Sequence, residues 1–106
     1  MPYTADTEID LTTQTTGNYI ISSQHRRRGN PNKSIWTITY EEEVDCFIQA
    51  LNGNWKAENE AWGIKFMNGV LQVVGQNHNR KELKLAKFVN GTNTNVWHGY
   101  PADHMN

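Results

Sequence analysis

One stretch decides the fold: TYEEEVDCFIQALNG, residues 39–53. Thr39 and Glu42 have the spacing of a capping box, in which each side chain binds a free backbone N–H at the start of a helix. Apolar residues recur after it at i, i+3, i+4 and i+7, which places on one helical face Val44, Phe47, Ile48 and Leu51. Asn52-Gly53 then predicts a left-handed stop. The sequence therefore predicts one principal helix, over residues 40–52.

The polar residues of this helix have simple expected roles. Glu41, Glu42 and Glu43 fall in the first turn, where negative charge complements the helix dipole. We expect all three carboxylates to be solvated, and not to bind a metal or act as acids. Cys46 is the only cysteine, which excludes an intramolecular disulfide and a cysteine-based zinc site. A helical thiol of this kind is expected to be buried and inert.

Short alternating segments on both sides of the helix predict strands. Before it, residues 18–23 and 34–40 are expected to pair, joined by a long exposed hairpin loop over residues 24–33. After it, Asn68-Gly69 is a strong hairpin signal and sets a register. That register pairs Phe66 with Leu71 and Ile64 with Val73 on one apolar face. Further strands are expected over residues 82–89 and 95–98, with Pro101 ending the fold.

Runs of strands around one helix predict the α+β class. We expect a mainly antiparallel sheet of about five or six strands, with the helix at about residues 40–52 packed on one face. The 106 residues suffice for one domain, and four Trp, four Tyr and three Phe supply much of its core. Residues 1–17 are expected to form a polar N-terminal arm, and residues 18–106 a single globular domain.

Hydropathy and charge limit the classes of protein to which this chain can belong. No apolar run approaches the ~20 residues of a membrane span, and no basic and apolar leader is visible, so we expect a cytoplasmic protein without a membrane partner. The net charge of −1 conceals a segregation of charge along the chain. Residues 21–34 hold four bases and no acid, whereas residues 35–60 hold six acids and one base. Such blocks predict one acidic and one basic face.

Three histidines lie beside basic or aromatic residues and are the candidate catalytic side chains: His98, His78 and His25. Arginine forks bind phosphate oxygens in pairs, and aromatic rings stack on unpaired bases. Candidate nucleic-acid contacts are therefore Arg26, Arg27, Arg28, Arg80, Lys81, Trp97 and Tyr100. The Gly-Tyr-Pro segment at residues 99–101 is expected to be a turn. No histidine spacing matches a metal motif, so no metal is expected.

These residues predict a small protein directed at RNA or single-stranded nucleic acid. Two histidines can cleave RNA without a metal, one taking the 2′-hydroxyl proton and the other protonating the leaving oxygen. A metal-independent ribonuclease of the toxin type and a plain RNA binder both fit. No Gly-rich phosphate loop, GxSxG elbow or dinucleotide fingerprint is present, so no cofactor is expected.

A protein–protein interaction module is the alternative. An immunity protein, an antitoxin or a phage-encoded inhibitor of a host defence protein would use Trp, Tyr and Arg as anchors. The basic and aromatic segments also have structural alternatives, in which the arginine loop is a solvated tip and Trp97 closes the core. A small-ligand or glycan module is a third hypothesis, because Trp and Asn are plentiful.

Overall fold

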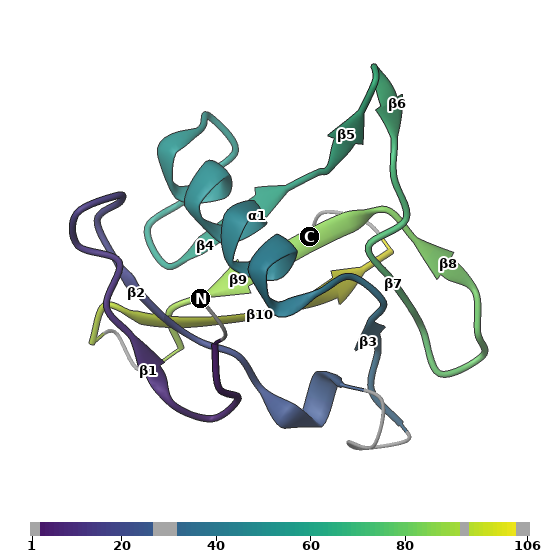
Figure 1. Ribbon diagram of the computed structural model, residues 1–106, viewed down its shortest axis with the longest axis horizontal. Helices are drawn as coiled ribbons and strands as arrows, with labels where there is room; N and C mark the ends of the chain where they lie inside the picture. The colour runs from purple at the N-terminus through teal and green to yellow at the C-terminus, as the bar shows by residue number, and fades with distance from the viewer. Residues whose placement is uncertain (1–2, 27–31, 92–93, 104–106) are drawn as a thin grey trace.

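The structure is a computed structural model that describes residues 3–26, 32–91 and 94–103 (Figure 1). Its elements are β1 (Glu8–Ile9), β2 (Asn18–Ile20), the 3₁₀ turn η1 (Ser23–His25), β3 (Ile35–Trp36), α1 (Tyr40–Asn52), β4 (Glu60–Gly63), β5 (Phe66–Met67), β6 (Val70–Leu71), β7 (Gly75–Gln76), β8 (Glu82–Leu83), β9 (Leu85–Val89) and β10 (Val96–Ala102). None of the described helices is long and apolar enough to cross a membrane.

The main sheet has five strands in the order β1-β2-β10-β9-β4. All its pairings are antiparallel except that of β10 with β2, which is parallel. Helix α1 lies across one face of this sheet (Figure 1). Smaller sheets are formed by β3-β7-β8 and by the β5–β6 hairpin. The α+β class with one helix on a mainly antiparallel sheet is therefore confirmed.

Helix α1 has the predicted bounds, 40–52, and the predicted capping box between Thr39 and Glu42. Its buried face packs on the sheet through a cluster of rings, in which Phe47 contacts Tyr19, Phe88 and Trp97. The predicted left-handed stop is wrong, because Gly53 has a φ of −98° and extended backbone.

Side chains along β10 alternate between the two faces of the sheet. Trp97, Gly99 and Pro101 are buried on the helix side, and His98 and Tyr100 lie on the other side. The expected turn at residues 99–101 is therefore wrong, because these residues continue the strand. Gly99 is required there by packing, since a Cβ would lie 2.3 Å from the Phe88 ring. Along β10, strand β2 pairs only with the first two residues, so the other side of β10 is unpaired with β2 at Pro101. Proline is tolerated at such an edge position.

Two further strand predictions are wrong because the chain changes sheet. β2 belongs to the main sheet and β3 to the β3-β7-β8 sheet, so they do not form a hairpin. The expected strand over residues 82–89 is divided at Lys84 into β8 and β9, which also lie in different sheets. This division explains the imperfect alternation of its apolar residues.

The β5–β6 hairpin has the predicted turn and register. Asn68 and Gly69 have φ values of 54° and 80°, and Phe66 pairs with Leu71. Its predicted apolar face is only partly buried, because the hairpin projects from the body (Figure 1): Phe66 is exposed and its partner Leu71 is half-buried. Phe66, Met67 and Val70 are 58%, 52% and 61% exposed.

The N-terminal segment lies against the domain. Leu11 is fully buried in the core, and Tyr3, Ala5 and Ile9 pack against that core. The backbone N–H of Asp6 donates to the carbonyl of Ile21 at 2.7 Å. This packing places Asp6 and Glu8 beside the start of β10, where they border a cavity together with Val96 and His98.

Candidate functional site

The face of the main sheet opposite α1 carries a row of aromatic and cationic side chains. Tyr100 of β10, Lys87 of β9 and Trp62 of β4 stand at the same register position on three neighbouring strands. The Lys87 ammonium lies 5.9 Å from the centre of the Trp62 ring and 3.2 Å from a carboxylate oxygen of Glu60. No described α-helix covers this surface, which we call the open face.

The turn η1 brings His25 onto the open face. The imidazole stacks on the Tyr100 ring with centres 5.3 Å apart and planes inclined by 19°. His25 Nδ1 lies 2.8 Å from the carbonyl oxygen of Ser34. Because a carbonyl only accepts hydrogen bonds, Nδ1 carries the hydrogen and neutral His25 presents Nε2 as an acceptor.

His98 lies close to His25. Burial lowers the pKa of His25, and the positive charges of Lys33 and His98 lower it further. Burial and the charge of Lys33 also lower the pKa of His98. Both imidazoles are therefore mainly neutral at pH 7. Three segments distant in sequence thus bring together two neutral histidines, an ammonium and a phenol ring.

His78 occupies a different place. It lies in the exposed loop between β7 and β8 and borders a cavity of about 300 Å³ together with Tyr100 and Lys87. His78 therefore lies at the edge of the open face. His25 and His98, by contrast, lie within electrostatic reach of each other.

Arg26 is an internal anchor. Its guanidinium donates to the carbonyl of Ile38 and to Glu43, and it stacks over the Tyr40 ring with 4.6 Å to the ring centre. Its predicted role as a phosphate contact has no support in this geometry, because the guanidinium is engaged inside the fold. The anchor fixes the chain directly after His25, and so holds the imidazole over Tyr100.

The expectation that Glu43 is solvated is wrong. Its side chain is 0% exposed and accepts hydrogen bonds from Tyr19 and Arg26. Burial raises the pKa of Glu43 to about 7, although both partners act in the opposite direction. Glu41 and Glu42 keep their expected places at the surface of the first turn, where Glu42 also pairs with Lys65 at 3.2 Å.

The other basic residues that were predicted to contact nucleic acid lie in different parts of the chain. Arg27 and Arg28 lie outside the described residues. Arg80 is exposed in the β7–β8 loop, and the Lys81 ammonium lies 3.1 Å from the carboxylate of Asp103. The pairs that involve Arg26, Lys65, Lys81 and Lys87 each join a basic segment to an acidic one. Part of the charge that is segregated in the sequence is thus paired in space.

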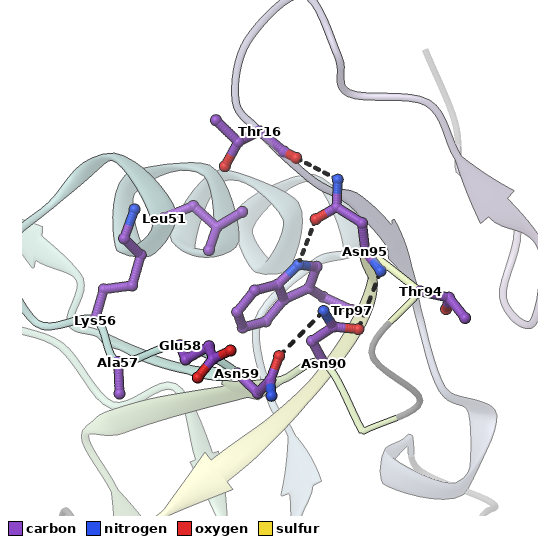
Figure 2. A pocket seen from close by; sticks show the side chains of 10 residues that line it. All are labelled: Thr16, Leu51, Lys56, Ala57, Glu58, Asn59, Asn90, Thr94, Asn95 and Trp97. Carbon is purple, nitrogen blue, oxygen red and sulfur yellow. Dashed lines mark hydrogen bonds between the residues drawn. The ribbon is translucent and has the colours of Figure 1, made fainter.

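Trp97 does not lie on the open face. Its indole is 4% exposed and forms the floor of a cavity of about 580 Å³ on the helix side of the sheet (Figure 2). A chain of hydrogen-bonded asparagines closes this cavity: Trp97 donates to Asn95, whose backbone N–H donates to Asn90, which donates to Asn59. Because Trp97 is only 4% exposed and packs in the core, it offers little surface on which a base could stack.

The sequence analysis missed three residues of the open face: Lys33, Lys87 and Trp62. For Trp62 and Lys87 a signal exists, because each alternates with small or buried residues in a strand (Ala61 and Gly63, Ala86 and Phe88). Lys33 lies in the same predicted loop as His25, but only folding brings it within electrostatic reach of His98.

Within the described ranges no group of three or more His, Cys, Asp or Glu side chains could hold a metal ion. No protein-family model matches the chain, and neither a curated protein nor a solved structure matches it significantly. The geometry of the open face is therefore the basis for assigning a function.

Proposed function

We propose that this protein binds single-stranded RNA on the open face and cleaves it through His25 and His98. The observation that carries the proposal is the stacking of His25 on Tyr100 within electrostatic reach of His98 and Lys33. Ring surfaces on a sheet suit unpaired bases, which stack on aromatic side chains without regard to sequence. Lys33, which is exposed, supplies a cation for the RNA backbone.

The two histidines suit a transesterification that needs no metal. His25 Nε2 accepts the proton of a ribose 2′-hydroxyl, and the 2′-oxygen attacks the neighbouring phosphorus. The bond from phosphorus to the 5′-oxygen breaks, and protonated His98 gives that oxygen its proton. The products are a 2′,3′-cyclic phosphate and a 5′-hydroxyl, and Lys33 stabilises the charge that develops on the phosphate oxygens.

The test uses a fluorescent single-stranded RNA octamer. We expect binding that weakens steeply as salt is raised, because neutralising phosphates releases counterions. We expect His25→Ala and His98→Ala each to lower the cleavage rate at least 100-fold, within the range of general acid–base catalysis. His78→Ala is the matched control and should lower the rate less than threefold. Absence of salt-sensitive binding contradicts the proposal, and binding without cleavage reduces it to an RNA binder.

A protein–protein interaction module remains the second candidate, because of the β5–β6 hairpin. Phe66, Met67 and Val70 are each more than half exposed on an element that projects from the domain. Exposed apolar patches of this kind mark interaction sites on soluble proteins. A Phe66→Ser, Val70→Thr variant should leave RNA binding unchanged. If that variant abolished a stable complex with a co-purifying protein, the second candidate would be favoured.

A further inference from the structure

A second cavity lies on the open face, beside His98. Its volume is about 520 Å³, within the range of small-ligand sites. Asp6 and Glu8 from the N-terminal segment, Ile20 of β2, and Val96 and His98 of β10 border it. It therefore adjoins one member of the proposed catalytic pair, on the side away from Tyr100 along β10.

Hydrogen-bond acceptors border this cavity. The Asp6 carboxylate accepts from the backbone N–H of Ser23 at 3.1 Å, and its hydrogen bonds with Ser23 lower its pKa, so Asp6 is ionised at neutral pH. One Glu8 oxygen accepts from the Asn18 amide at 2.9 Å, and Glu8 is exposed at the edge strand β1.

The side chains of Ile20 and Val96 add apolar surface to the cavity. A matching ligand is flat, has apolar faces and carries hydrogen-bond donors at its edge. Adenine, cytosine and guanine offer two N–H donors in an exocyclic amino group, whereas uracil offers the single N3–H between two carbonyl acceptors that the carboxylates repel. The two carboxylates also repel phosphate, so the RNA backbone is directed away from the cavity toward Lys33.

We infer that this cavity is a base-binding subsite that selects a nucleotide with an exocyclic amino group, next to the phosphate held at His25 and His98. This inference rests on the proposed function. His98 and Tyr100 point to the same face two residues apart, about 7 Å along the strand. A base in the cavity and its neighbour on Tyr100 then lie on opposite sides of the phosphate.

The experiment compares four RNA octamers, namely oligo-U and oligo-U with one central A, C or G. We expect kcat/KM to be about 10-fold higher for at least one substituted octamer than for oligo-U. Glu8→Gln should reduce this preference to twofold or less. Glu82→Gln, an exposed acid of β8, is the matched control and should keep the full preference.

Each outcome separates the two proposals. If no octamer is bound or cleaved, the proposed function fails, and the subsite fails with it. If all four octamers are cleaved equally, the subsite is refuted and the proposed function stands. A preference that Glu8→Gln leaves intact also refutes the assignment of the subsite to this cavity.

Discussion

Substitution of Arg26 by methionine tests the internal anchor of the site. Methionine keeps the aliphatic part of the side chain, but it removes the guanidinium together with its charge, its hydrogen bonds and its stacking on Tyr40. Glu43 is then left 0% exposed with Tyr19 as its remaining partner. Removal of one member of a buried ion pair typically costs about 3–5 kcal/mol, because the other charge stays buried. The free energy of unfolding of a domain is roughly 5–15 kcal/mol in total.

The pH dependence of this loss follows from Glu43. Burial raises its pKa in the folded protein from an ordinary 4.5 to about 7. The folded state therefore binds more protons than the unfolded state between these values, so this carboxyl favours folding at low pH. Its contribution is lost as pH rises toward 7. Without Arg26 the pKa rises further, so the deficit of the variant is larger at pH 8 than at pH 5, by up to about 1.4 kcal/mol for the one pH unit above a pKa of about 7.

The assay is equilibrium unfolding in urea at pH 5 and pH 8. Arg26→Met should lose about 3–5 kcal/mol at pH 8 relative to the parent protein. Arg80→Met is the control and should change stability by less than about 0.5 kcal/mol, because Arg80 is exposed. The double variant Arg26→Met, Glu43→Leu should recover about half of the loss, because an apolar pair needs no charge partner. A loss below about 1 kcal/mol, or one equal at both pH values, would refute the argument.

Three further predictions concern the core and the histidines. Gly99→Ala places a Cβ 2.3 Å from the Phe88 ring, so we expect thermal unfolding to show a loss of about 1–3 kcal/mol or more; an unchanged Tm would contradict this packing. Cys46 is 3% exposed and burial raises its pKa to about 12, so a thiol reagent at pH 8 should label it only after unfolding; rapid labelling of the native protein would be inconsistent with burial. The lowered pKa values of His25 and His98 place the maximal cleavage rate below pH 6.5, because one of the two must be protonated; a maximum above pH 8 would exclude them as the pair.

Local signals determined the part of the fold that the sequence predicted correctly. The helix over residues 40–52 has its cap and its apolar face within one stretch, and the Asn68-Gly69 turn sets its own register. Neither needs a partner from elsewhere in the chain. The α+β class followed because these elements alternate with short strands.

Long-range contacts determined what the sequence did not reveal. Glu43 resembles an ordinary first-turn acid until Arg26, 17 residues earlier, is seen to bind it. Residues 99–101 have the composition of a turn, yet Gly99 is there because Phe88 packs on it. The sequence named His25 and His98 as candidates, but their approach depends on η1 and β10 meeting, and the charge of Lys33 acts on both of them only in that arrangement.

Titration of ¹⁵N-labelled protein with an oligo-U octamer, followed by NMR, tests the RNA-binding surface most directly. The account predicts salt-sensitive shifts in the amide signals of His98, Tyr100 and Lys87, with the β5–β6 hairpin unaffected. Shifts confined to that hairpin, or no shifts at all at low salt, would contradict it.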